Sequence, residues 1–537
     1  MKKKSSKNYK TISVSKFSNK YFDDIQKILE IIKNIDNNIK LDIDCQYIDL
    51  KQVLISYYLL FLIFIKEITH KNQEYLNTLK KDYYFNQIAT NQKISEYHKE
   101  KEIIERETDI IINDINIRTR LKKSQIQKIE LVIDNCCHNL KEAFMNISVN
   151  DFNMLPKEVL EHYDKSILKE HYLLYCTFIS FDTIENIKQY LKYKCQVNFS
   201  LDKKSHNYTI YLSNKTQVNK LKSTLLKKIA VEILFFDTLF SYNVTQIPTY
   251  NIYYTDLKKK LPQNNDIKKT KKTRKIKNQE VLFRPINVNT AVTDNQSNIV
   301  IWRKEELLKS ILHEAIHFYK LDTKSNIVNN QIKEFILKKF KINKKSYFHI
   351  AEAFTELNAN IINSIFNLYY LKPNLLNKSS LENSFLKIMM DEINFSIKQT
   401  AKIFKLCNYK FPRDFLRTKT NSRSKTNHKS IKQLTDVTSY HIIKSIFLFN
   451  IESIYSLNYK DNQNKEGPIK LLIALNFGHL NNKNQDNIKL FILEIKKIIN
   501  NSFKKSNNWS KEVQRVLNKK LSLKKDNTMR MTYFNND

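Results

Sequence analysis

Residues 305–320 read EELLKSILHEAIHFYK and contain the pentapeptide His313-Glu314-Ala315-Ile316-His317. Apolar residues recur through this stretch three and four positions apart, which is the spacing of one face of an α-helix. Neither Gly nor Pro interrupts the pattern. We therefore expect a half-buried helix, with Glu305 and Glu306 in its first turn, where the helix dipole favours carboxylates.

Two histidines four residues apart lie on the same face of a helix, so His313 and His317 can point at one spot. A pair of neutral imidazoles placed in this way suits Zn²⁺, and the neighbouring carboxylate of Glu314 can reach a zinc-bound water. The alternative is a surface helix with two solvated histidines. The apolar neighbours Ile311 and Leu312 favour the metal site.

Composition indicates a globular chain rich in helices. The 537 residues are 42% hydrophobic and 27% charged, which is enough for two to four domains with a substantial core. Only 2 Gly and 7 Pro are present, and the first proline is Pro156. So few glycines exclude a glycine-rich phosphate loop and therefore the common nucleotide-binding motifs.

The formal net charge of +37 suggests a nucleic acid or another anionic partner. The excess comes from Lys spread along the chain, and we find no Arg-rich recognition helix or aromatic RNA-binding motif. The bias toward Lys, Asn and Ile is also typical of an AT-rich genome. A nucleic-acid partner is therefore possible but not favoured, and we interpret the basic stretch 258–277 as a solvated insertion.

The cysteines and the apolar runs indicate a cytoplasmic protein. The six cysteines include no CxxC pair, so we expect reduced thiols rather than a disulfide framework. The start of the chain lacks an apolar segment, so we expect no signal peptide. The most apolar run, 53–65, is too short to span a bilayer, and no transmembrane segment is favoured.

The order of elements predicts an α+β, mostly helical protein in three parts. We expect an all-helical N-terminal domain at 1–190, a domain with a small mixed sheet at 191–455, and a helical C-terminal extension at 456–537 with a frayed basic tail. The alternating pattern predicts an open sheet beside the histidine helix, and its candidate edge strand for binding an extended peptide is 287–293. The middle part should contain strands at 196–201, 208–212, 250–254, 286–293 and 298–302 and a helix at 218–242.

A third metal ligand must come from outside the pentapeptide, because catalytic zinc usually takes three protein ligands. A second strong helix begins near residue 346, runs to about Tyr370 and carries Glu352 and Glu356 one turn apart on one face. One carboxylate could bind the metal while the other orients a ligand imidazole. From the residues alone, Glu352, Glu356 and His349 all stay open as the third ligand.

The pentapeptide, followed by a helix reading Glu-Ala-Phe-Thr-Glu at 352–356, resembles the gluzincin branch of the zincin metallopeptidases. The resemblance implies a zincin-like fold, Zn²⁺ as cofactor, Glu352 as the third ligand and Glu356 as the residue that orients an imidazole. It covers 195–455 in element order and is motif-specific at 286–320 and 347–362. The spacer of 34 residues between His317 and Glu352 is longer than in thermolysin-like members.

The sequence is also similar to uncharacterised metallopeptidases of large DNA viruses, which places the chain in the host cytoplasm or the virion. A peptidase needs a donor for the developing oxyanion, and Tyr440 and Tyr347 are the candidates. We therefore expect a zinc metallopeptidase that acts on a peptide or protein substrate, with Glu314 as general base. The alternatives are a catalytically idle zincin-fold structural or interaction protein of the virion, and a basic nucleic-acid-associated protein.

Overall fold

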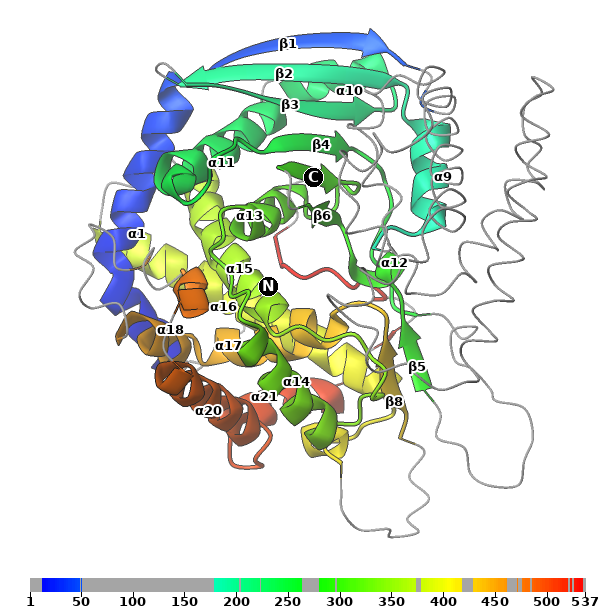
Figure 1. Ribbon diagram of the computed structural model, residues 1–537, viewed down its shortest axis with the longest axis vertical. Coiled ribbons are helices and arrows are strands. Elements are labelled where there is room, and N and C mark those ends of the chain that lie inside the picture. The colour runs from blue at the N-terminus through cyan, green and yellow to red at the C-terminus, as the bar shows by residue number, and fades with distance from the viewer. Residues whose placement is uncertain are drawn as a thin grey trace, which may run out of the picture. The chain divides into compact units, whose positions relative to one another are not determined.

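A computed structural model gives the architecture of the chain (Figure 1). Three features considered above lie outside its described residues: the apolar run 53–65, most of the basic stretch 258–277, and Cys136, Cys137 and Cys176. No helix among the described residues is long and apolar enough to cross a membrane. The structure describes residues 12–48, 50, 178–201, 204–222, 224–262, 280–294, 297–372, 378–417, 428–460, 471, 476–482, 485–519, 522–523 and 526–534.

The chain divides into two compact units. The second unit comprises Gln46–Lys194 and Tyr211–Asn214, and its principal described element is helix α9 (Phe181–Tyr190), which buries Ile184 and Ile187. The first unit comprises Met1–Cys45, Cys195–Ile210 and Lys215–Asp537, and it contains every residue of the site described below.

A mixed six-stranded sheet has the strand order β1-β2-β3-β4-β7-β6. Strand β4 runs parallel to β7 with Thr249 opposite Asn298, whereas β6 runs antiparallel to β7 with Ala291 opposite Ile301. The α+β, mostly helical class is confirmed, as are the strands expected at 196–201, 208–212, 250–254 and 298–302, although β3 already begins at Lys204 within the predicted turn. The strands are β1 (Lys40–Tyr47), β2 (Tyr193–Leu201), β3 (Lys204–Leu212), β4 (Thr249–Tyr253), β6 (Ala291–Thr293) and β7 (Asn298–Ile301).

Strand β1 lies in the region that the sequence predicts to be helical throughout, so that prediction is wrong at Lys40–Tyr47. Leu41, Ile43 and Cys45 alternate with exposed polar residues there, which is the period of a half-buried strand. Cys45 forms a disulfide with Cys195 of β2. The expectation of reduced thiols is therefore wrong for this pair, while Cys407 is free and buried.

The strand expected at 286–293 is shorter than predicted, because its first half is the short helix α12 (Pro285–Val288). Pro285 fits the first position of a helix, where its missing N–H costs nothing. The side-chain Oδ1 of Asn287 accepts a hydrogen bond from the backbone N–H of Arg284 at 2.7 Å and closes the turn. Only Ala291–Thr293 forms the edge strand β6.

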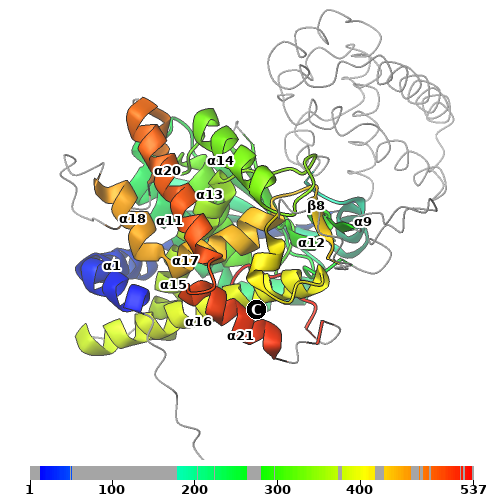
Figure 2. The ribbon, with the colours of Figure 1, turned by 90° about the horizontal axis from the view of Figure 1, so that it is seen from below.

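Helix α13 (Leu307–Phe318) packs against α11, α15 and strands β6 and β7 (Figure 1). The helix expected at 218–242 is split into α10 and α11. Figure 2 shows α16 beside α21, two helices that also contact each other. The remaining elements are α1 (Ile12–Asn38), α10 (Lys215–Lys222), α11 (Leu225–Phe240), α14 (Asn326–Lys339), α15 (Ala351–Leu371), α16 (Lys378–Leu406), α17 (Lys444–Phe449), α18 (Ile451–Lys460), α20 (Gln485–Ser502), α21 (Asn508–Asn518) and the two-stranded parallel sheet β5 (Glu280–Phe283) with β8 (Ser430–Gln433).

Residues 526–534 pack against the first unit, so the expectation of a frayed tail is wrong for this part of the chain. Met529 and Thr532 are fully buried. The backbone N–H of Leu261 donates to the carbonyl of Asn527 at 2.8 Å, and that of Met529 donates to the carbonyl of Lys259 at 3.0 Å. Residues 526–534, which we call the C-terminal strap, therefore belong to the core of the first unit.

The buried face of α13 should dominate the stability of the first unit. Leu312 is fully buried on α13, whereas Leu490 is 62% exposed on α20. Replacing Leu312 by Ala removes packed methyl groups and leaves a cavity, so the free energy of unfolding should fall by about 2–5 kcal/mol. Urea denaturation followed by circular dichroism measures the change. The matched variant Leu490→Ala should stay within about 0.5 kcal/mol of the wild type. Equal losses of stability in the two variants would contradict the buried position of Leu312.

Candidate metal centre

The sequence predicts that Glu305 and Glu306 lie in the first turn of this helix. In the structure, α13 begins at Leu307, directly after both glutamates. Glu306 has the left-handed backbone angle φ 63° and lies just before the helix. Glu305 accepts a hydrogen bond from the backbone N–H of Lys259 at 2.7 Å, and Glu306 pairs with the Lys259 ammonium at 2.7 Å. The two carboxylates therefore hold the segment after β4, and Glu306 makes no side-chain hydrogen bond that caps the helix.

Three side-chain atoms converge where α13 crosses α15. The Nε2 atoms of His313 and His317 lie 3.1 Å apart. The Oε2 atom of Glu352, in the first turn of α15, lies 3.4 Å from the first and 3.6 Å from the second. Tetrahedral zinc with ligands at about 2.0–2.2 Å would separate its ligand atoms by roughly 3.3–3.6 Å. These three residues form a group that could hold a metal ion, as the sequence predicts.

Both imidazoles are oriented by carboxylates at their other ring nitrogen. The Nδ1 atom of His317 lies 2.9 Å from Oδ2 of Asp322, and that of His313 lies 2.9 Å from Oε1 of Glu356. A carboxylate can only accept a hydrogen bond, so the hydrogen bond between His317 and Asp322 favours a hydrogen on Nδ1 of His317. The His313–Glu356 contact is at ion-pair distance without hydrogen-bond geometry, and the negative charge there favours a hydrogen on Nδ1 of His313 as well. Each Nε2 then keeps its lone pair for a metal, which is the usual arrangement around zinc-bound histidines.

The residues present fit a zinc ion. With hydrogens on both Nδ1 atoms, the lone pairs of His313, His317 and Glu352 face one another with no proton between them. Oε2 of Glu352 is buried and has no hydrogen-bond partner among the described residues. A cation at the centre removes this repulsion and gives the buried oxygen a partner. Two imidazole nitrogens and one carboxylate oxygen are a donor set typical of catalytic zinc.

Charges within this group shift its pKa values. Burial lowers the pKa of His317, but the carboxylates of Glu352 and Asp322 outweigh it and hold the pKa well above its ordinary value. His313 behaves similarly, because the nearby carboxylates of Glu352 and Glu356 outweigh burial and raise its pKa. Burial would raise the pKa of Glu352, yet the two imidazoles hold it well below its usual range. Without metal, the imidazoles of this centre therefore hold their protons to a higher pH than an ordinary histidine does.

Asp322 is positioned by the turn that ends α13. Lys320 adopts the left-handed angle φ 58°, and the backbone N–H of Leu321 donates to the carbonyl of Ile316 at 3.0 Å. Gly478 packs directly on this turn and donates its N–H to the carbonyl of Leu321 at 3.1 Å. A Cβ atom at 478 would approach the Lys320 carbonyl oxygen to 2.0 Å, so one of the two glycines of the chain is required here.

Glu314 lies beside the metal group and is held by the edge strand. Its Oε2 atom accepts a hydrogen bond from Oγ1 of Thr293, the last residue of β6, at 2.6 Å. Glu314 is buried. The carboxylate is therefore fixed in direction next to His313, and its second oxygen remains available to a water or a substrate N–H.

The other predicted site residues occupy different positions. Tyr440, in the π-helical segment Thr438–Ile443, places its ring 6.2 Å from the ring of His313. Burial and the Glu352 carboxylate hold the pKa of Tyr440 well above its usual range, so it keeps its hydrogen. Tyr347 instead packs against His349 with ring centroids 4.5 Å apart. His349 donates its backbone N–H to Asp436 at 2.5 Å and does not join the metal group.

Sequence reasoning missed Asp322, Thr293 and Lys309. Lys309 forms an ion pair with Glu356, so that this carboxylate contacts both an ammonium and the imidazole of His313. Its position four residues before His313 on the same helix face was a usable signal. Asp322 follows His317 closely, but only the turn at Lys320 brings it back to the imidazole. Nothing in the sequence alone pairs Thr293 with Glu314.

Comparison with known proteins gives one distant relative. The chain is 24% identical over 291 residues to an uncharacterized protein of Acanthamoeba polyphaga mimivirus. The aligned region covers 53% of this chain and 69% of that protein. No protein-family model matches the chain, and no solved structure matches it. A viral relative agrees with the predicted viral resemblance, while the family itself is not identified by these comparisons.

Removing the carboxylate at Asp322 should weaken zinc binding. Asp322→Asn keeps the shape of the side chain but loses the charge that orients His317, so the zinc affinity should fall about 10- to 100-fold. Competition with a fluorescent chelator measures it. The control is Asp256→Asn, because the side chain of Asp256 is 78% exposed and pairs only with Lys304 among the described residues. Equal affinities for the two variants would contradict this role of Asp322.

Zinc binding should also strengthen as pH rises. The raised pKa values of His313 and His317 mean that protons compete with zinc for both imidazoles up to a higher pH than at an ordinary histidine. The affinity should therefore change by up to about 100-fold per pH unit below those pKa values and level off above them. Calorimetry in buffers of different ionisation enthalpy counts the released protons. An affinity that does not change between about pH 6 and about pH 8 would rule out these imidazoles as ligands.

Proposed function

We propose that the protein is a zinc-dependent hydrolase of peptide bonds with a zincin-like catalytic region of the gluzincin type. The observation that carries the proposal is the convergence of His313, His317 and Glu352 next to Glu314. The order of edge strand β6, helix α13 and helix α15 supports the same fold type. The pentapeptide adds a sequence pattern in which the acid beside the first histidine serves as a general base.

In this proposal, His313, His317 and Glu352 hold the zinc. When bound, zinc lowers the pKa of a coordinated water and polarises the carbonyl of the substrate. Glu314 takes the proton of the water and passes it to the leaving amine. The hydrogen bond from Thr293 keeps one oxygen of Glu314 occupied, so the other oxygen faces the reacting groups. Tyr440 keeps its hydrogen and packs its ring 6.2 Å from that of His313, and in this proposal it would donate to the oxyanion that forms on the former carbonyl.

The edge strand supplies the binding surface for the substrate. Strand β6 is the last in the sheet order, and β7 is its one strand partner among the described residues. An extended peptide could add to the outer side of β6 through backbone hydrogen bonds. Because Thr293 of β6 also contacts Glu314, a peptide on this edge would pass directly beside the general base.

The Glu314→Gln variant tests the proposal. The amide keeps the size of the side chain and can still accept from Thr293, but it cannot take a proton, so hydrolysis should fall about 100- to 10,000-fold. Bound zinc, measured by mass spectrometry of metals, should be unchanged. The control is Glu334→Gln, because Glu334 is exposed on α14.

Three results would separate this function from the alternatives. Full activity in Glu314→Gln would contradict the proposed base. Zinc binding without hydrolysis of a diverse peptide library by the wild type would favour an idle structural protein. Salt-sensitive nucleic-acid binding in zinc-free protein, again without hydrolysis, would favour the nucleic-acid-associated alternative.

A further inference from the structure

A short segment after strand β8 is hydrogen-bonded to the chain regions that carry Glu352 and Tyr440. It runs from Gln433, the last residue of β8, to Ser439 in the π-helical turn, and we call it the junction segment. A buried polar side chain is costly unless it is hydrogen-bonded, so the partners of such side chains indicate what they hold in place. Five polar side chains of the junction segment are at most 2% exposed: Gln433, Thr435, Asp436, Thr438 and Ser439.

Two of these side chains hold His349, which lies three residues before Glu352 in the sequence. The Oδ1 atom of Asp436 accepts a hydrogen bond from the backbone N–H of His349 at 2.5 Å. The hydroxyl of Ser439 donates to the carbonyl of His349 at 2.7 Å. The backbone carbonyl of Asp436 also accepts from the N–H of Tyr440 at 2.8 Å. One aspartate therefore contacts both the segment that leads into α15 and the residue proposed as the oxyanion donor.

Gln433 makes a second bridge between the same two regions. Its Nε2 atom donates to the carbonyl of Tyr347, and its own backbone carbonyl accepts from the N–H of Tyr347 at 3.1 Å. Its Oε1 atom accepts from the hydroxyl of Thr438 at 2.6 Å and from the N–H of Thr438 at 3.0 Å. The approach to α15 and the beginning of the π-helical turn are thus held together at two points.

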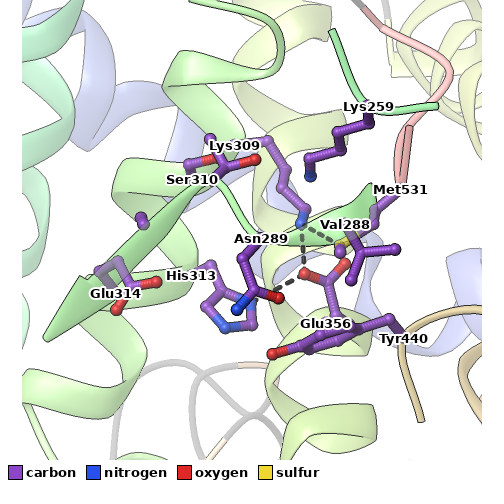
Figure 3. A pocket seen from close by; sticks show the side chains of 12 residues that line it. Lys259, Val288, Asn289, Lys309, Ser310, His313, Glu314, Glu356, Tyr440 and Met531 are labelled. Atoms are coloured by element: carbon purple, nitrogen blue, oxygen red, sulfur yellow. Dashed lines mark hydrogen bonds and ion pairs between the residues drawn. The ribbon is translucent and has the colours of Figure 1, made fainter. Parts of the chain in front are cut away.

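The junction segment also reaches a small pocket beside the metal group. The hydroxyl of Thr435 donates to Oδ1 of Asn289 at 2.7 Å. Asn289 and Tyr440 line this pocket together with His313 and Glu314. Figure 3 shows the ring of Tyr440 extending toward His313, with the hydroxyl at the end nearer that imidazole. The same short segment therefore contacts two walls of the pocket and the approach to the third ligand.

Tyr440 lies in a π-helical turn, Thr438–Ile443, which is an uncommon conformation that is frequently found at functional sites. The turn begins at Thr438, the residue that Gln433 holds through both its hydroxyl and its N–H. Because these bonds fix where the turn begins, they also fix the direction from which Tyr440 approaches His313.

We propose that Asp436 is a positioning residue that aligns the zinc ligand Glu352 with the donor Tyr440. This inference rests on the proposed function, since it concerns the same metal site. Glu352 lies in the first turn of α15, so a shift of His349 would move its carboxylate relative to the two Nε2 atoms on α13. Zinc needs its nitrogen and oxygen ligands at about 2.0–2.2 Å, so a small displacement weakens binding. Asp436 acts through Glu352 and is not itself one of the converging ligands.

Zinc affinity tests the inference without requiring hydrolysis. Asp436→Ala removes the acceptor for His349, so the affinity measured by competition with a fluorescent chelator should fall about 10- to 100-fold. Asp436→Asn keeps an oxygen acceptor at the same place and should stay within about three-fold of the wild type. A loss in Asp436→Asn as large as that in Asp436→Ala would overturn the role of this hydrogen bond.

A double-mutant cycle separates positioning from a general loss of stability. If Asp436 acts through Glu352, Asp436→Ala should change the zinc affinity of a Glu352→Ala variant by less than about two-fold. Fully additive losses would contradict the inference. The stability control is Ile495→Ala, because Ile495 is fully buried on α20, which packs against α14, α17 and α21. It should lower the midpoint of thermal unfolding and leave the zinc affinity unchanged.

A second variant covers the case in which Asp436→Ala does not fold. Ser439→Ala removes the other hydrogen bond to His349 and leaves the carboxylate of Asp436 in place. Its zinc affinity should fall several-fold. An affinity equal to that of the wild type would overturn the inference.

Kinetics at saturating zinc test the alignment of Tyr440. A misplaced donor loses an interaction made only in the transition state, so Asp436→Ala should lower kcat with little change in KM. A change confined to KM would contradict this alignment. Coupled losses of zinc affinity in a protein that hydrolyses no peptide would keep the positioning role and overturn the peptidase. Hydrolysis by the wild type, with zinc affinity and kcat unchanged in Asp436→Ala, would keep the peptidase and overturn the inference.

Discussion

The structure around α13 depends on one constraint: the lone pairs of His313, His317 and Glu352 point toward one another. Two imidazole nitrogens and a carboxylate oxygen lie within 3.6 Å of one another, and each ring has its other nitrogen against a carboxylate. In a buried position this arrangement is unfavourable unless protons or a cation lie between the atoms. Protons can relieve the repulsion, as the raised pKa values of His313 and His317 indicate. A zinc ion would relieve it in the same way. Metal binding and proton release are therefore linked.

The surrounding fold holds this centre through buried charged groups. Glu356 joins His313 to Lys309, while Glu306 joins Lys259 to the backbone N–H groups of Met531 and Thr532 at 2.6 Å. The C-terminal strap is thus connected to the start of the metal helix through the carboxylate of Glu306. Paired buried charges of this kind add little net stability, but removing one partner is costly. They fix the direction of the side chains, which a metal site requires.

Much of the centre could be predicted from the sequence, because its information is local. The helix period placed His313 and His317 on one face, and the one-turn spacing of Glu352 and Glu356 predicted that the two would face the same way. Deciding between these two carboxylates needed the crossing of α13 over α15, which puts Glu352 at the two Nε2 atoms and Glu356 behind His313. The gluzincin resemblance implied the same assignment.

The failures have physical causes of two kinds. Pro285 and Asn287 form a local turn, which overrides the alternating pattern that predicts a strand at 286–293. At Leu41 and Ile43 the alternation is short and lies between helical patterns, so the sequence predicts a helix where strand β1 forms. Asp322, Thr293 and the strap depend on tertiary contacts, for which one sequence carries no signal. The strap in particular looked like a polar tail, yet its backbone groups bond to Glu306, Lys259 and Lys444 deep in the unit.

X-ray absorption at the zinc edge tests the central claim most directly. Protein loaded with one zinc should show a first shell of nitrogen and oxygen alone at about 2.0–2.2 Å, with the outer-shell pattern of two imidazoles. Replacing His317 by Ala should reduce that pattern to one imidazole. A sulfur contribution at about 2.3 Å, or an imidazole pattern that survives the replacement of His317, would contradict the site described here.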